Sequence, residues 1–593
     1  MKCGIEVHQR LLGNKLFCNC PSEPKNGPIM EVRRRLHPVL SELGEIDVAA
    51  QFEYLKGKEF VYQVYDNVCE VELDESPPTP LNGEALRTAL EISLLLGGTP
   101  VDEAHVMRKI VLDGSAVTSF QRSALIATGG RIETSRGPID IETICLEEES
   151  AGIVKEEDGV VTYRLDRHGI PLIEIATSPN IIDGEHALET AEKIGALLRL
   201  TGKVQRGIGT IRQDVNISTE KGARVEVKGA QELKLIPKLI ENEVKRQERL
   251  VELYAEIRKR FGGKVAIKEK ITDLTPVFKE TKCSIIKKSI SKGGVVLGML
   301  LPLHKGLLGF ELCKGRRYGT ELSDYAKAAG VKGIIHCDED MKRYEISDSE
   351  VRKLTKELRC SADDGFALIT GEEEMTTRAM KALLRRALLL AVPEEVRKAL
   401  PDGTTSYMRP LPGRARMYPE TDVEPVKITK DMITEIGKKL PPKPEEKRKE
   451  LLSMLNKELA EKMLLSRRLP LFEKIVGLGI DPVLAASTLE NTLVSLKRDG
   501  VPTENLKDDS ILSLFSEYKK ETFVKAAIPD ILAHLARNLS ASPKDAIKSL
   551  GLERISGNEL LSIVKREKDF GSIMAKYRLR VDPKEVQELL KRK

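Results

Sequence analysis

The sequence contains no apolar run of 18 or more residues, and its N-terminus lacks the apolar core of a secretory signal. These absences argue against a membrane-spanning helix and a secreted product, so we expect a cytoplasmic protein with no membrane partner. Cysteine is sparse, with nine residues scattered over 593 positions. Scattered cysteines are typical of a reducing compartment, which agrees with that location.

Familiar nucleotide-binding motifs are missing too. The sequence has no GxxxxGK[ST] phosphate loop, no Gly-rich kinase loop with HRD and DFG partners, and no GxSxG elbow. P-loop NTPases, protein kinases and α/β-hydrolases are therefore disfavoured. The Gly207-Ile208-Gly209 stretch could bring backbone amides close to a phosphate, but a lone GxG pattern also marks a bulge or a tight turn.

Charge is nearly balanced, with 96 Lys and Arg against 91 Asp and Glu and a net charge of +5. Such a balance does not by itself demand a nucleic-acid partner. Residues 541–593, however, contain 13 basic and 8 acidic residues, so the whole excess of five lies in this segment. We therefore expect the C-terminal end to form a basic module.

The length predicts several hydrophobic cores, and the pattern of strand-like and helix-like segments changes along the chain. Residues 1–281 alternate short strand-like and helix-like runs, and the Pro- and Arg-rich residues 401–428 continue that part. Residues 282–400 have the pattern of a separate α/β unit, while 429–515 and 516–593 are dominated by helical periodicity. We predict an α/β (α+β) multidomain protein, with a mixed-sheet domain, an inserted α/β domain and all-helical C-terminal domains.

The opening stretch GIEVH predicts a strand with one apolar and one polar face. Side chains at i and i+2 of a strand point to the same side, so Glu6 and His8 stand together while Ile5 and Val7 point the other way. The polar face could carry chemistry. It could also belong to a half-exposed edge strand with two solvated side chains.

A second polar face is predicted in the hairpin of residues 207–229. Arg212, Asp214 and Asn216 share one face of its first strand, and Glu226 and Lys228 share one face of the second. The two strands would present a continuous row of charged groups over an apolar back. An ordinary amphipathic hairpin with its polar side in water is the alternative.

Further carboxylates lie in apolar surroundings. Glu174 stands between isoleucines in PLIEIATSPN, where a carboxylate needs a cation, a metal or a hydrogen-bond donor. The segment LEEESAG adds Glu147–Glu149, which could instead be a solvated acidic loop. Magnesium prefers several carboxylate oxygens. The candidates for one such cluster are Glu6, His8, one of Glu147 to Glu149, Glu174 and Asp214.

Together these motifs resemble the GatB/GatE family of tRNA-dependent amidotransferase subunits. The matching stretches, in family order, are GIEVHQRL with KLFCNC, RKIVLDGSAVTSFQRS, LEEESAG, GIPLIEIATSPN, GTIRQDVNIS and VEVKG. Residues 282–400 resemble the insertion domain of bacterial-type aspartyl-tRNA synthetases, and MRPLPGRARMYPETDVEP is also similar to the archaeal E branch. The resemblance therefore favours the E branch over the bacterial B branch.

The resemblance implies a catalytic cradle in residues 1–281, continued by 401–428, that uses ATP and Mg²⁺ to phosphorylate the side chain of glutamate on tRNA(Gln). Ammonia then displaces the phosphate to give Gln-tRNA(Gln). Carried over by position, the implied metal ligands are Glu6, His8, Glu149 and Glu174, and Asp214 joins them in the catalytic set. Glu149 is preferred to Glu148 because SAG aligns with the family's DAG, although Ser150 departs from that Asp. The implied nucleotide-binding residues are Gly207, Gly209, Arg212, Glu226 and Lys228.

The resemblance also implies partners. Ammonia would come from GatD, an asparaginase-like glutaminase, in a heterotetramer of two GatD copies and two copies of this chain, and the basic tail would bind the tRNA. Zinc is not expected, because Cys18 and Cys20 in CNCP have no second close cysteine pair at ligand spacing, such as the B branch often carries. Two other functions stay open: a tRNA-binding scaffold without catalysis, and a B-type enzyme that also acts on Asp-tRNA(Asn).

Overall fold

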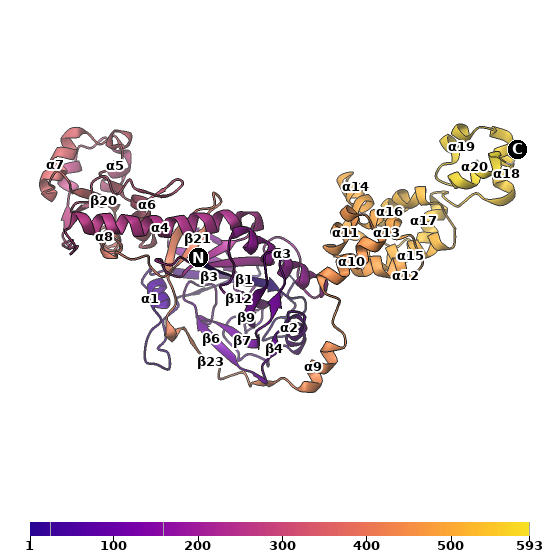
Figure 1. The fold of residues 1–593 in the computed structure, drawn as a ribbon, viewed down its shortest axis with the longest axis horizontal. Coiled ribbons are helices and arrows are strands. Elements are labelled where there is room, and N and C mark those ends of the chain that lie inside the picture. Colours follow the sequence, from indigo (N-terminus) through magenta and orange to yellow (C-terminus); the bar gives the residue numbers. More distant parts are fainter. Residues whose placement is uncertain (24, 158, 592–593) are drawn as a thin grey trace. The chain divides into compact units, whose positions relative to one another are not determined.

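The structure is a computed structural model that describes residues 1–23, 25–157 and 159–591 (Figure 1). The chain forms two compact units. The first comprises residues 1–198 and 203–440, and the second comprises 199–202 and 441–593. The predicted tail runs to residue 593, so its last two positions lie outside the described residues.

The first unit is built on a mixed sheet of twelve strands, counted over the described residues. The strand order is β22-β21-β14-β13-β1-β12-β9-β7-β6-β23, with β4 paired to β7 and β8 paired to β9. The strands are β1 (Lys2–Arg10), β4 (Thr99–Pro100), β6 (Val106–Ile110), β7 (Phe120–Thr128), β8 (Arg131–Ile132), β9 (Ile139–Glu148), β12 (Pro171–Thr177), β13 (Ile211–Ser218), β14 (Val225–Ala230), β21 (Glu395–Ala399), β22 (Thr405–Pro410) and β23 (Met417–Pro419).

Strand β1 lies in the middle of this sheet. It pairs antiparallel with β12 on one side and with β13 on the other, so the edge-strand alternative is wrong. Ile5 and Val7 are almost fully buried in the main core, as the period of two predicts. Helices α2 (Gly83–Leu95) and α3 (Gly184–Leu200) cover that apolar face and leave the other face to the polar side chains.

A smaller sheet completes the sheet domain. It has the order β10-β11-β3-β2 and packs its own apolar cluster around Tyr62 and Tyr163. Its strands are β2 (Met30–Arg34), β3 (Glu59–Val64), β10 (Gly152–Glu157) and β11 (Val160–Arg164). The short helix α1 (Val48–Tyr54) lies between β2 and β3 in the sequence and is N-capped by the side chain of Asp47.

The helix α4 (Ile236–Arg260) leads from the main core into a second α/β core. Its first turns bury Leu239 and Ile240 in the main core, and its later turns bury Leu250 and Leu253 in the second. The second core packs around a sheet of order β15-β16-β20-β19. The elements are β15 (Ile271–Asp273), α5 (Ser284–Ile290), β16 (Val295–Leu301), α6 (Tyr318–Ala328), β19 (Ile335–His336), α7 (Asp348–Leu358), β20 (Gly365–Gly371) and α8 (Glu373–Leu388).

Six charged side chains join α4, α6 and α8 to the returning strand β21, and all are nearly fully buried. Glu321 on α6 is at the centre, because its carboxylate lies 2.8 Å from Arg246, 3.1 Å from Arg386 and 3.2 Å from Arg397. The remaining members are Glu243 and Glu395. Three carboxylates thus face three guanidinium groups, which is how buried charges are tolerated.

The second unit is helical. One core extends from Leu451 to Leu552 and crosses the predicted boundary at residue 516, and a separate small core extends from Ile555 to Val586. The helices of the larger core include α10 (Pro444–Met454), α11 (Lys457–Leu464), α12 (Leu469–Gly477), α15 (Asp508–Lys519), α16 (Ile528–Arg537) and α17 (Pro543–Ser549). The small core contains α18 (Gly557–Glu567), α19 (Phe570–Tyr577) and α20 (Pro583–Lys591).

The predicted fold class, α/β (α+β) with a mixed-sheet domain and a helical C-terminal region, is confirmed. Helix α9 (Lys430–Gly437) packs on α2 in the first unit, although the sequence placed it at the start of the helical part. Similarly, β15 lies ahead of the predicted boundary at residue 282, yet it pairs with β16, which lies after that boundary. Among the residues that the structure describes, no helix is both long enough and apolar enough to cross a membrane.

Candidate active site and metal-binding residues

The polar face of β1 and its two neighbours gathers most of the predicted site. His8 lies directly opposite Glu174 of β12 and opposite Arg212 of β13, while Glu6 lies opposite Asp214. Directly opposed side chains on one face of a sheet are close enough to touch. The predicted shared face of Glu6 and His8 is therefore present, and Glu174 and Asp214 join it.

Two overlapping groups of ligand atoms form on this face. Glu6, His8 and Asp214 place one ligand atom each within 4.8 Å of one another, and so do His8, Glu147 and Glu174. The Nε2 atom of His8 is 3.1 Å from Glu174, whereas its buried Nδ1 has no hydrogen-bond partner in the described part of the chain. Carboxylate oxygens with one imidazole suit a divalent cation such as Mg²⁺ or Mn²⁺, so the residues fit the implied metal.

Two lysines border the carboxylates. Lys109 of β6 contacts Glu147 and lies 3.5 Å from Glu174, and Lys228 of β14 lies 3.0 Å from Asp214 and 2.6 Å from Glu226. The residue patterns of the sequence do not single out Lys109, although it stands in the family stretch RKIVLDG. Five carboxylates, counting Glu6, thus face two lysines, and a bound cation would balance the excess of negative charge.

The pKa values reflect this excess. Burial, together with the charges of Glu174 and Glu226, raises the pKa of Glu6 to about 7. Burial opposes the charged form of His8, but its hydrogen bond to Glu174 and that carboxylate's charge outweigh burial and raise the pKa of His8. Burial also opposes the charged form of Glu174, yet Lys109 and His8 hold its pKa well below the usual range. The negative charge of Glu174 is therefore paired with Lys109 and His8, whereas Glu6 faces other carboxylates that oppose its ionisation.

Glu149 does not reach the cluster. Its fully buried carboxylate is 2.8 Å from Arg10, 3.3 Å from Arg167 and 2.9 Å from Arg212. Burial opposes ionisation, but the three guanidinium groups prevail and lower the pKa of Glu149 to about 2. The structure brings Glu147 to His8 and Glu174 in the place that the family register assigned to Glu149.

The glutamate run is not a solvated loop. All three side chains, Glu147, Glu148 and Glu149, are at most 3% exposed. Alternation along β9 sends Glu147 to the polar face and Glu148 to the opposite face, where it lies 3.3 Å from Arg122. Each carboxylate therefore has its own cationic partner, and one of the three belongs to the metal-binding group.

The predicted nucleotide-binding residues fall into two groups. Arg212, Glu226 and Lys228 lie on the polar face, beside Asp214 and Glu149. Gly207 and Gly209 form a turn ahead of β13, with φ angles of 132° and 78° that favour glycine, and Thr210 donates to the carbonyl of Gly207 at 2.9 Å. Their turn lies just ahead of β13. This geometry agrees with a tight turn and also with backbone amides that contact a phosphate.

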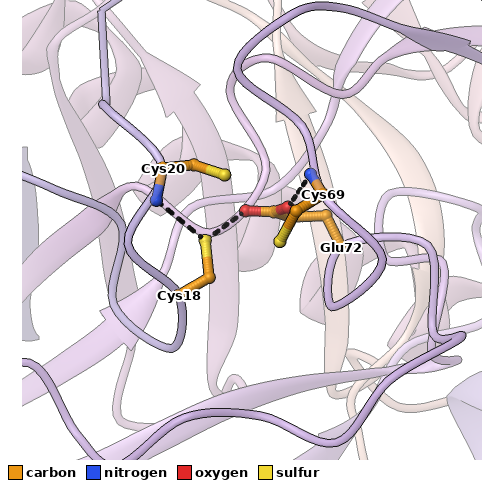
Figure 2. Close-up of side chains that lie close together, drawn as sticks. All are labelled: Cys18, Cys20, Cys69 and Glu72. Atoms are coloured by element: carbon orange, nitrogen blue, oxygen red, sulfur yellow. Dashed lines mark hydrogen bonds between the residues drawn. The ribbon is translucent and has the colours of Figure 1, made fainter.

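A separate group of ligand atoms comes from the segments of Cys18–Cys20 and Cys69–Glu72. Cys18, Cys20, Cys69 and Glu72 place their ligand atoms within 4.8 Å of one another (Figure 2). The Cys18 thiol donates to Glu72 at 2.8 Å, and Lys15 lies 3.1 Å from the same carboxylate. Three sulfurs and one carboxylate oxygen are ligands that Zn²⁺ takes in four-coordinate sites. Cysteine spacing does not reveal this set, because Cys69 is distant in the sequence from Cys18 and Cys20 and Glu72 is not a cysteine.

Comparisons with known proteins agree with the motifs. A family model described as the GatB/GatE catalytic domain matches residues 1–434, and one described as a GatB domain matches residues 470–566. The chain is 46% identical to the E subunit of the glutamyl-tRNA(Gln) amidotransferase of Pyrococcus abyssi, over 95% of the chain and 89% of that relative. It is 44% identical to the protein of the same name in Methanocaldococcus jannaschii, over 100% of the chain and 98% of the relative.

Proposed function

The chain belongs to the GatB/GatE family, as its motifs predicted, and we propose that it is the catalytic subunit of an amidotransferase that converts Glu-tRNA(Gln) into Gln-tRNA(Gln). The observation that carries the proposal is the cluster of Glu6, His8, Glu147 and Glu174 on one face of the central strands. Relatives that match over nearly their full length are named as glutamyl-tRNA(Gln) amidotransferases, which favours glutamate on tRNA(Gln) as the substrate. The scaffold alternative gives no reason for such a cluster.

The proposed reaction has two steps. A carboxylate is a poor electrophile until one oxygen becomes part of a leaving group. The γ-phosphoryl group of ATP is therefore first transferred to the side-chain carboxylate of the glutamyl ester, and ADP leaves as the bond between the β-phosphate oxygen and the γ-phosphorus breaks. The nitrogen of ammonia then attacks the carbonyl carbon, the carbon–oxygen bond to phosphate breaks, and a proton leaves the new amide. Bound Mg²⁺ would neutralise charge on the transferring phosphoryl group.

The residues of the chain have distinct tasks in this proposal. His8, Glu147 and Glu174, with Glu6 and Asp214 beside them, would hold the metal ion. Lys109 and Lys228 carry the positive charges nearest to the carboxylates and would contact phosphoryl oxygens. Arg212 stands directly opposite His8, yet its guanidinium is committed to Glu149, so we assign it to positioning the strands.

Ammonia and tRNA require further partners. We propose GatD, an asparaginase-like glutaminase, as the ammonia source, in a complex with two copies of each chain. The basic residues of 541–593 would contact the tRNA backbone, so binding should weaken steeply with salt and depend little on base sequence.

The test is an amidation assay with Glu-tRNA(Gln), ATP and either glutamine plus GatD or ammonium chloride alone. Formation of Gln-tRNA(Gln) in both arms is expected. A chain that binds tRNA but shows no ATP consumption stimulated by Glu-tRNA(Gln) would be a scaffold. Equal amidation of Asp-tRNA(Asn) in the same assay would favour a B-type enzyme.

A further inference from the structure

The outer face of α1 is apolar and largely exposed. Val48, Phe52 and Leu55 follow one another at helical spacing, with Leu55 at the C-cap, and Val48 and Leu55 are 54% and 60% exposed. An apolar stripe on a surface helix normally faces a core. Here it forms one wall of an open groove of about 410 Å³.

Small residues form part of the opposite wall. Ala328 and Ala329 at the end of α6 and Ala382 of α8 face the stripe, and the rings of Tyr325 and Tyr407 stack at 3.7 Å within the same lining. Small side chains on one wall leave width for an inserted segment, and a groove of this volume accepts several side chains.

The charge along the groove has one sign. The charged residues of its lining are Lys56, Arg378 and Arg385, with no carboxylate in the lining as far as the structure describes the chain. Lys56 is paired with Glu53 at 2.7 Å, whereas Arg378 donates to the carbonyl of Leu55 and Arg385 to that of Lys381. Among the described residues no carboxylate lies within ion-pair distance of either arginine. An occupant with acidic groups beside apolar ones would complement this lining.

Exposed apolar side chains also concentrate around α1. Twelve large apolar side chains are at least half exposed in residues 1–23, 25–157 and 159–591, and six of them lie between residues 29 and 55. Those six are Ile29, Met30, Leu40, Leu43, Val48 and Leu55. Apolar surface gathered in one segment, with aromatic and arginine neighbours, is typical of a protein interface rather than of a phosphate-binding surface.

We propose that the groove between α1, α6 and α8 binds an apolar and acidic segment of the polypeptide that supplies the ammonia. This rests on the proposed function, which requires ammonia from a second polypeptide. Apolar side chains of that segment lie against Val48, Phe52 and Leu55, and its carboxylates lie against Arg378 and Arg385. The occupant is a protein segment because the stripe offers nothing to a sugar–phosphate backbone.

The test measures the affinity of the full chain for purified GatD by sedimentation velocity and calorimetry. Leu55→Asp and Arg385→Glu are each expected to weaken the complex at least tenfold, and Arg385→Glu should also reduce its salt dependence. Ile153→Asp, a control at a side chain of 64% exposure on β10, should bind as the parent does. Circular dichroism melts identify a variant that fails to fold, and Val48→Asp or Arg378→Glu then replaces it.

The outcomes separate the possible occupants. Unchanged affinity of folded variants for GatD overturns the proposal, whether or not they lose self-association of the chain or affinity for tRNA. The same variants should lose amidation with glutamine but keep amidation with ammonium chloride. If the parent chain forms no Gln-tRNA(Gln) with ammonium chloride, the proposed function fails, while the affinity measurement still decides the groove.

Discussion

Arg212 and Glu149 form a two-point ion pair across the polar face of the sheet, with N–O distances of 3.0 and 2.9 Å. Arg10 and Arg167 contact the same carboxylate, so one buried negative charge holds three positive charges. The arrangement predicts a structural rather than a metal-binding role for Glu149.

Replacing Glu149 with Gln should therefore destabilise the sheet domain by about 3 kcal/mol at pH 7, because it leaves three guanidinium groups without their counter-charge. The folded-state pKa of Glu149 is about 2, below the usual 4.5, so its contribution is complete above pH 4.5 and is lost as the pH falls toward 2. Urea denaturation should show the gap between parent and variant closing as the pH falls from 4.5 toward 2. Glu185→Gln, at an exposed position, is the control. A gap that is constant with pH would contradict this assignment.

Metal binding should depend on Glu147 and Glu174 rather than on Glu149. Glu147→Gln and Glu174→Gln are expected to weaken Mn²⁺ binding by about tenfold or more, while Glu149→Gln retains it wherever the variant is folded. Electron paramagnetic resonance of free Mn²⁺ measures the affinity directly, and Glu220→Gln on the surface serves as the matched control. In the amidation assay Glu174→Gln should also abolish γ-phosphorylation, and retention of that step would remove its metal role.

The group around Cys18 should hold zinc. We expect about one equivalent of Zn²⁺ in purified protein by atomic emission, since a four-coordinate site takes one ion. Cys69→Ser should lose the ion and lower the melting temperature, because metal affinity adds to folding free energy. Cys360→Ser removes a cysteine outside the group and should keep it. If the parent protein is free of metal after preparation with Zn²⁺ present, the ion pair with Lys15, and not a zinc ion, balances the charge of Glu72.

The buried charges around Glu321 should act as a unit. Glu321→Gln is expected to cost about 3–5 kcal/mol, because it leaves Arg246 and Arg397 short of a carboxylate in a dry environment. Hydrogen exchange should then report opening of β21, which those side chains hold beside β14. Glu357→Gln, on the exposed face of α7, should change neither. Equal protection of β21 in both variants would exclude the proposed connection.

The sequence predicts what a period of two can determine. Glu6 and His8 face the same side because strands alternate, and Ile5 and Val7 enter the core for the same reason. The period of two does not predict which way the side chains of Glu147, Glu148 and Glu149 point. Their directions depend on where β9 ends and on which neighbouring strand supplies a cation, and the local sequence determines neither.

Contacts over long sequence distances escaped prediction for a related reason. Lys109 meets Glu147 through the pairing of β6 with β7 and of β7 with β9, which only the completed sheet defines. Cys69 and Glu72 reach Cys18 from a separate loop. Family motifs can point to such residues, but the carried-over register still placed Glu149 where the structure has Glu147.

Helix α4 has one end in each of two cores, with Leu239 in the first and Leu253 in the second. The inserted domain is therefore not a removable attachment. Excising residues 282–400 would expose the apolar side chains of the distal half of this helix and would also remove β21 from the main sheet. A lineage that lost the insertion would have to replace several apolar residues of α4 with polar ones at nearly the same time. That requirement makes the insertion easier to keep than to discard.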